Sequence, residues 1–146
     1  MSSIRVVGTV FKKRGEEGDF DWMIRSGKYN DALFIYNDDE MRQHWKKAGT
    51  GNAIIRKYNR YALARPNSAG VVTGTGSSGY SKLTEEVKQK IDGCFSGIRE
   101  LCSLHGYKTI YYSASTPNGL LGTSIFVVNP DVLKYITEGL NSLGSF

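Results

Sequence analysis

Uninterrupted runs of apolar and β-branched residues predict where this chain forms strands. The run at residues 32–36, Ala-Leu-Phe-Ile-Tyr, does not alternate between apolar and polar positions. We therefore expect it to be a central strand that is covered on both faces. Further strands are predicted at residues 4–11, 107–114 and 124–128.

Residues 49–79 give a weaker signal. Only residues 53–55 and 70–73 resemble strands there, and mostly polar residues and glycines surround them. Irregular segments of this kind usually lie at the surface and often carry functional residues. We therefore expect part of any functional site in this region.

Capping residues and apolar periodicity predict three helices. Thr84 is a good N-cap, is followed by two glutamates, and precedes apolar positions at helical spacing up to a stop at Gly106. Asn129, followed by a proline and an aspartate, opens a second helix near the end of the chain. A shorter helix is expected from an N-cap at Asn37 to about Lys47, because three acids follow the cap and a glycine follows the last turn.

Strands that alternate with helices predict an α/β domain, with a mixed or mostly parallel central sheet sandwiched by helices. The chain has 146 residues, which is long enough for one hydrophobic core. No shift in composition marks a boundary along it. We therefore expect a single domain over residues 1–146.

Hydropathy, the spacing of the cysteines and the net charge indicate the location of the protein, the state of its thiols and the charge of its partners. No apolar run approaches the roughly 18 residues of a membrane helix, so we expect a cytoplasmic protein that does not contact a membrane. Cys94 and Cys102 lie in one predicted helix, too far apart for a disulfide, and are expected to be free thiols. The net charge of +5 favours anionic partners.

A glycine-rich motif follows the strand-like residues 70–73. Residues 74–79, Gly-Thr-Gly-Ser-Ser-Gly, match the G-x-G-x-x-G pattern, in which backbone N–H groups can surround a phosphate. The N-cap at Thr84 comes too late for a dinucleotide-binding fold, where the third glycine already lies in the helix. The alternative is a flexible loop without a ligand.

Two more glycine-rich turns occur at residues 49–52 and 118–123. Both are expected to follow elements of the same α/β framework, and open sheets bind ligands beyond the carboxyl ends of their strands. The three turns could therefore converge on one anion.

A basic run interleaved with aromatic residues indicates a second class of function. Its members are Arg56, Lys57, Tyr58, Arg60, Tyr61 and Arg65. Such a mixture can bind phosphates and stack bases, so a nucleic acid or another protein is the alternative partner. The structural alternative is a solvated loop whose arginines lie on tyrosine rings.

The sequence does not indicate a conventional combination of catalytic residues or of metal ligands. His44 falls in the short predicted helix, and His105 falls at the end of the long one, where the helix dipole favours a cation. The cysteines and histidines lack the spacing of zinc ligands. We therefore expect no metal and no cofactor, and whether the domain is an enzyme stays open.

Ordered fragments across most of the chain resemble landmarks of the macro-domain family. These fragments are residues 4–10, 31–34, 49–55, 70–73, 107–113 and 119–122. The resemblance implies a three-layer α/β/α domain that binds ADP-ribose or a related nucleotide. It implies that the turns at residues 49–52 and 119–123 hold the diphosphate and the distal ribose, with Asn37 or Asp38 near that ribose. The family's adenine-contacting acid is replaced by Thr9.

The whole sequence also resembles small proteins of large tailed bacteriophages. That resemblance implies a phage product in the host cytoplasm, where nucleotide binding could interfere with host nucleotide signalling or where the partner is a host protein. For an enzyme, the macro-domain resemblance implies hydrolysis or transfer at an ADP-ribosyl bond, with Asn37, Asp38 and Asn52 near the ribose.

The candidate ligand-binding residues combine the glycine-rich turns, the family resemblance and the basic run. They are Asn37, Asp38, Gly49, Gly51, Asn52, Arg56, Gly74, Gly76, Gly79, Ser113, Gly119, Gly122 and Thr123. The oligomeric state stays open.

Overall fold

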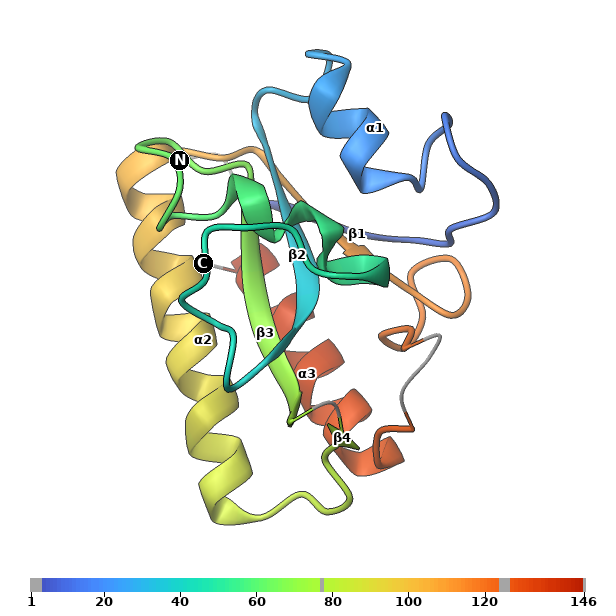
Figure 1. Cartoon of the computed structure of the whole chain (residues 1–146), viewed down its shortest axis with the longest axis vertical. Helices are drawn as coiled ribbons and strands as arrows, with labels where there is room; N and C mark the ends of the chain where they lie inside the picture. Colours follow the sequence, from blue (N-terminus) through green and yellow to red (C-terminus); the bar gives the residue numbers. More distant parts are fainter. Residues whose placement is uncertain (1–3, 77, 124–126, 146) are drawn as a thin grey trace.

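The computed structural model describes residues 4–76, 78–123 and 127–145, which form one α/β domain around a five-stranded sheet. The order of the strands across the sheet is β1-β5-β2-β3-β4 (Figure 1). The first four in this order are parallel, and β4 pairs antiparallel to β3. The predicted mixed, mostly parallel sheet is therefore confirmed. The strands are β1 (Arg5–Thr9), β2 (Ala32–Asp39), β3 (Ser68–Thr75), β4 (Ser78–Gly79) and β5 (Thr109–Ser113).

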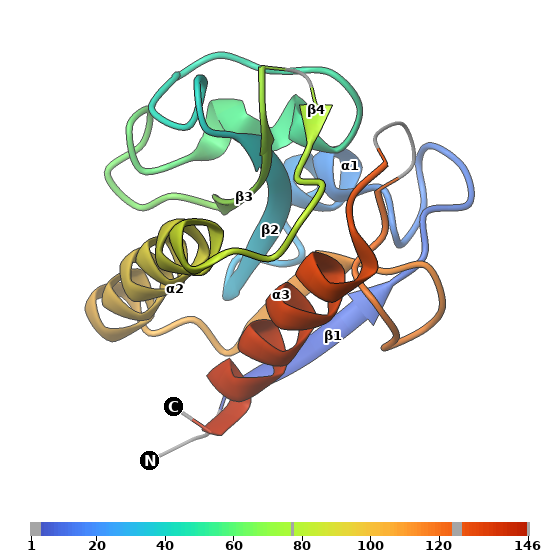
Figure 2. The ribbon, with the colours of Figure 1, turned by 90° about the horizontal axis from the view of Figure 1, so that it is seen from below.

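Helices cover both faces of the sheet, so the domain has three layers (Figure 2). The helices are α1 (Phe20–Arg25), the 3₁₀ helix η1 (Gly51–Tyr58), α2 (Glu85–His105), α3 (Pro130–Ser142) and the 3₁₀ turn η2 (Leu143–Ser145). The long helices α2 and α3 pack on one face, and α1 and η1 pack on the other.

The central strand β2 supplies side chains to both cores. Leu33 and Ile35 point to the core under α2 and α3, while Phe34 and Tyr36 point to the core under α1 and η1. The alternation follows from the geometry of a strand, whose successive side chains face opposite sides. The prediction that residues 32–36 form a central strand covered on both faces is confirmed.

The two long helices begin and end as their capping residues predict. The Thr84 hydroxyl accepts a hydrogen bond from the backbone N–H of Val87 at the start of α2, and Gly106 ends that helix in a left-handed conformation. Asn129 caps α3, and its side chain accepts from the N–H of Asp131. Each cap satisfies backbone groups that have no partner within the helix.

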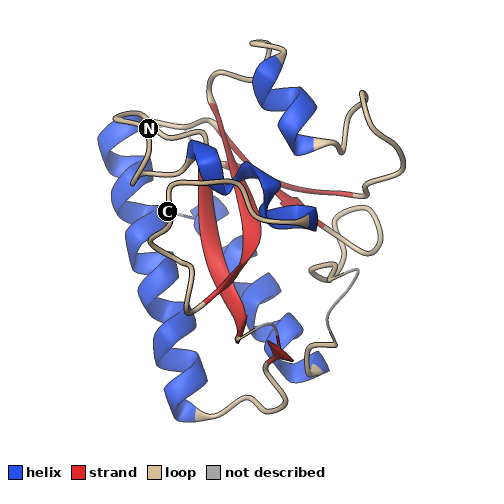
Figure 3. Cartoon of the chain, viewed as in Figure 1, coloured by secondary structure: helices blue, strands red, loops and turns tan. Residues whose placement is uncertain are grey.

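The prediction of a helix from Asn37 to about Lys47 is wrong. Residues 37–39 continue β2 and pair with β3, with Asn37 opposite Val71 and Asp38 opposite Val72. The segment that follows consists of turns and irregular chain (Figure 3). Asn37 therefore caps no helix, and its own N–H donates to the side chain of Asn52.

Three smaller predictions also differ from the structure. Residues 53–55 lie in η1 and not in a strand. Helix α1 was not predicted, although Asp19 caps it by accepting from the N–H of Trp22. Of the strand expected at residues 124–128, residues 124–126 lie outside the described part of the chain, and Val127 and Val128 belong to no strand.

Two further observations concern the helices. Cys94 and Cys102 are free thiols, as predicted. Among the described residues, no helix combines the length and the apolar character that crossing a membrane requires.

The contact between α2 and α3 predicts opposite effects for two glycine-to-alanine changes. A Cβ at Gly139 would lie 2.5 Å from the ring of buried Phe95, whereas a Cβ at Gly93 would meet no atom within 4 Å. We expect Gly139→Ala to lower the free energy of unfolding by about 1–3 kcal/mol through overpacking. Gly93→Ala should raise it by about 0.5–1 kcal/mol through helix propensity. Urea unfolding of both variants measures this, and equal effects would contradict the packing described.

Candidate functional site

The chain leaves the sheet in opposite directions from the two neighbouring strands β2 and β5. After β2 it leads to η1 on one face, and after β5 it leads to α3 on the other (Figure 2). Strand β2 also extends beyond β5, because these strands pair only from Ala32 to Ile35 on the β2 side. Open α/β sheets characteristically leave a ligand-sized crevice outside the carboxyl ends of strands that diverge in this way.

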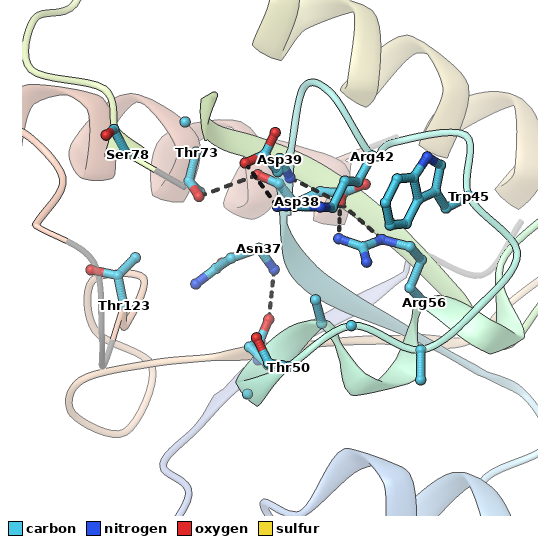
Figure 4. A pocket seen from close by; sticks show the side chains of 16 residues that line it. Asn37, Asp38, Asp39, Arg42, Trp45, Thr50, Arg56, Thr73, Ser78 and Thr123 are labelled. Atoms are coloured by element: carbon cyan, nitrogen blue, oxygen red, sulfur yellow. Dashed lines mark hydrogen bonds and ion pairs between the residues drawn. The ribbon is translucent and has the colours of Figure 1, made fainter. Parts of the chain in front are cut away.

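A cavity of about 400 Å³ lies at this point, over the carboxyl end of β2 (Figure 4). Its walls come from the ends of β2 and β3, from the turn before η1 and from the loop after β5. Residues of all three predicted glycine-rich turns line it. The candidate residues that the structure brings together here are Asn37, Asp38, Gly49, Gly51, Asn52, Arg56, Gly74 and Thr123.

The other candidate residues are not among those that line the cavity. Gly76 is in the turn after β3, and its N–H donates to Asp39. Gly79 lies in β4, Ser113 ends β5, and Gly119 sits in the loop beyond β5. The carbonyl oxygen of Gly122 accepts a hydrogen bond of 2.8 Å from the Asn37 side chain, so Gly122 supports the wall from behind.

A buried ion pair forms the floor of the cavity. Nε and Nη2 of Arg56 lie 3.1 and 2.6 Å from Oδ1 of Asp38, which also accepts from the N–H of Asp39. The side chains of Arg56 and Asp38 are only 3% and 2% exposed. Burial raises the pKa of Asp38, and the hydrogen bonds from Arg56 oppose that effect. The pair therefore places a neutralised, rigid surface under any ligand.

Two glycines leave the space that this ion pair needs. A Cβ at Gly49 would lie 2.6 Å from Nη1 of Arg56, and a Cβ at Gly70 would lie 2.6 Å from Oδ2 of Asp38. Both distances are far below a van der Waals contact. Gly49 was predicted as a phosphate-contacting residue, and the structure shows that it also makes room for a guanidinium.

Asn37 joins three separate segments into one wall. Its backbone N–H donates to Oδ1 of Asn52 at 2.5 Å, and its side-chain amide donates to Gly122. These bonds connect the end of β2 with the first turn of η1 and with the loop after β5. The residues on either side of the cavity are therefore held at fixed positions relative to each other.

Sequence reasoning missed the side chains at the mouth of the cavity. Arg42 and Trp45 lie next to each other there, with the Arg42 guanidinium 5.4 Å from the indole centroid (Figure 4). Arg42 also pairs with Asp39 at 3.5 Å. The predicted helix concealed this arrangement, although a tryptophan among cations just before a glycine-rich turn was a usable signal.

The predicted basic run is largely occupied by partners within the molecule. Tyr58 and Lys57 both contact Asp21, and Tyr61 lies against His44. The remaining partners are Asp38 for Arg56, Glu100 for Arg60, and the Tyr107 ring together with the Asn30 carbonyl for Arg65. Arg65 on a tyrosine ring matches the structural alternative for this run.

Neither histidine is among the residues that line the cavity. His44 is in the irregular segment after β2, and His105 occupies the last turn of α2. In residues 4–76, 78–123 and 127–145, no group of three or more histidine, cysteine, aspartate or glutamate side chains is placed to hold a metal ion. The polar groups that line the cavity are backbone amides, hydroxyls, side-chain amides, carboxylates and guanidinium groups.

The buried pair predicts a large difference between two arginine replacements. Arg56→Met would leave the Asp38 carboxylate buried without compensation, so we expect a loss of about 3–5 kcal/mol in the free energy of unfolding. Arg60→Met removes a partly exposed pair with Glu100 and should cost less than about 1 kcal/mol. Adding Asp38→Asn to Arg56→Met should recover part of the loss. Urea unfolding of all three variants checks this, and equal losses for Arg56 and Arg60 would refute it.

Comparisons with known proteins add no family to this picture. Neither the family models, the curated proteins nor the solved structures contain a match to the chain, so the case for a function rests on the residues and geometry of this site.

Proposed function

We propose that the cavity binds a phosphate-bearing nucleotide or an ADP-ribose-like ligand. The observation that carries the proposal is the meeting of the three glycine-containing turns at the carboxyl end of β2, in one cavity. A volume of about 400 Å³ falls in the range of small-molecule sites, which is about 300–1,000 Å³. The macro-domain resemblance points to the same class of ligand.

The first turn of η1 is the best candidate for the phosphate contact. Gly51 and Asn52 are the first two residues of η1, and the first N–H groups of a helix have no acceptor within it. Both residues line the cavity. Their N–H groups and the positive end of the helix dipole favour an anion. Gly51 also has a φ of +56°, which glycine adopts without strain, and as a glycine it places no side chain between the backbone and the ligand.

Polar side chains around the cavity suit the hydroxyl groups of a sugar. Thr50, Ser78 and Thr123 supply hydroxyls from three sides (Figure 4). The Asn52 amide keeps its donor group, because its Oδ1 is the atom that binds Asn37. A ribose therefore finds donors and acceptors from segments that the Asn37 bonds hold in place.

Binding has more support at this site than a reaction at an ADP-ribosyl bond. Asp38 is the buried carboxylate of the cavity, and Arg56 neutralises it. Asn37 and Asn52 are bound to each other and hold the wall. The three residues that would serve a hydrolase or transferase are thus engaged in maintaining the site.

Titration with a panel of nucleotides tests the proposal. Isothermal calorimetry with ADP-ribose, AMP and NAD should show saturable binding for at least one of them. A ligand present at about 100 times its dissociation constant should raise the free energy of unfolding by about 2.7 kcal/mol. Absence of binding and of stabilisation for every nucleotide would overturn the proposal.

A matched pair of glycine variants locates the ligand. Gly51 and Gly15 both have positive φ, +56° and +79°, but Gly15 lies in the loop after β1, where a Cβ would meet no atom within 4 Å. Replacing either by alanine should cost about 1–2 kcal/mol of stability through backbone strain. Only Gly51→Ala should weaken nucleotide binding, by about tenfold or more. Equal affinities for the two variants would place the ligand elsewhere.

A further inference from the structure

An aromatic and basic surface begins at the mouth of the cavity and continues away from it. We name it the aromatic-basic strip, and it consists of Arg42, His44, Trp45, Lys46, Lys47 and Tyr61. Trp45 and Tyr61 are each 42% exposed. Arg42 and Trp45 also line the cavity, so the strip and the cavity form one continuous surface.

Buried Asn59 holds the two halves of the strip together. Its side-chain amide donates to the carbonyl oxygen of Trp45 at 2.8 Å, and its Oδ1 accepts from the N–H of Tyr61 at 3.0 Å. The rings of His44 and Tyr61 then meet edge to face, with centroids 5.0 Å apart. An irregular segment is thereby fixed against a turn that follows it in the chain, with its aromatic rings near the surface.

The two lysines of the strip differ from Arg42, which pairs with Asp39 at 3.5 Å. Lys47 Nζ lies 4.7 Å from the centroid of the Trp45 ring. Among the described residues, Lys46 and Lys47 form no ion pair. This contrasts with the basic run at residues 56–65, where carboxylates or carbonyls of the same molecule already hold the charges.

Exposed rings interleaved with unpaired cations fit single-stranded nucleic acid. Bases of a single strand can stack on aromatic side chains while the phosphates contact lysine and arginine. In a duplex the bases are already stacked on one another, so the indole of Trp45 would find no base face. The cavity, lined in part by the buried pair of Asp38 and Arg56, has the volume of a small-molecule site and therefore suits one terminal nucleotide of a strand.

We propose that the domain binds the end of a single-stranded nucleic acid, with the terminal nucleotide in the cavity and the next base on Trp45. Lys46 and Lys47 contact the phosphates that follow. This inference rests on the proposed nucleotide site and names the kind of molecule that carries the nucleotide. The extra contacts make a short strand a better ligand than a free nucleotide.

Binding of AMP and of a single-stranded pentaadenylate to the same protein tests the inference. The pentanucleotide should bind at least about tenfold more tightly than AMP, because one stacked base alone contributes about tenfold or more. Excess AMP should displace it. Trp45→Ala should weaken the pentanucleotide much more than AMP and so remove most of this advantage, whereas Gly51→Ala should weaken both ligands by a similar factor.

The two tryptophans of the chain, Trp22 and Trp45, provide a direct readout of stacking. In a Trp22→Phe variant all indole emission comes from Trp45, and the pentanucleotide should quench it. In a Trp45→Phe variant the emission comes from Trp22 in α1 and should not change. Far-UV circular dichroism of both variants confirms that each is folded.

Salt dependence tests the lysines. The logarithm of the affinity should fall linearly with the logarithm of salt concentration, and replacing both Lys46 and Lys47 by alanine should flatten the slope by about 0.7 for each phosphate that the lysines neutralise. The matched control replaces Lys12 and Lys13, which are exposed in the loop after β1. This loop lies far from the segment after β2 in both views (Figures 1 and 2).

The possible failures are distinguishable. If AMP binds but the pentanucleotide binds no more tightly, the proposal of single-strand binding is overturned and the proposal of a nucleotide site stands. If neither ligand binds, both proposals fall. Equal affinity for a duplex of the same sequence would overturn the single-strand assignment. Equal slopes for the two double-lysine variants would overturn the position of the strand on the strip.

Discussion

The ion pair between Asp38 and Arg56 is the interaction on which the site depends. Both side chains are almost completely shielded from water, so neither charge is tolerable without the other. Because Asp38 belongs to β2 and Arg56 to the last turn of η1, the pair fixes the helix over the end of the strand. The first turn of η1, which faces the cavity, is positioned by the same contact.

Around this pair, the protein uses side-chain amides to organise irregular backbone. Asn37 connects β2 with the start of η1 and with the loop after β5, and Asn59 connects the segment after β2 with the turn after η1. Irregular loops lack the repeating hydrogen bonds of helices and strands, so their backbone groups need such partners. Two asparagines therefore stabilise the walls of the cavity and the surface beside it.

The sequence predicts the regular part of this fold well, and the reason is local. The caps at Thr84 and Asn129 act on N–H groups two or three residues away, and the apolar run at residues 32–36 determines its own burial. The false helix after Asn37 arose because an asparagine followed by acids has the same local pattern at a strand end as at an N-cap. Distant partners distinguish the two cases: Asn37 pairs with Val71 in β3 and donates to Asn52, fifteen residues further on.

The candidate site also has some features that local sequence predicts and others that depend on distant contacts. Glycine-rich turns can be recognised by composition, and residues of all three meet at the cavity. The pairing of Asp38 with Arg56 and the position of Trp45 depend on the path of the chain between them. A run such as residues 56–65 gives no indication that Glu100, Asp21 and the Asn30 carbonyl will occupy its charges.

The place of β1 in the sheet has a consequence for how the chain reaches this structure. Arg5 pairs with Thr109, so β1 finds its neighbour in the sheet only after β5 has been synthesised. Closing such a long loop is entropically unfavourable, and contacts between distant parts of a chain slow folding. Until then, the apolar residues of β1 stay uncovered on the nascent polypeptide, where chaperones and wrong partners compete for them.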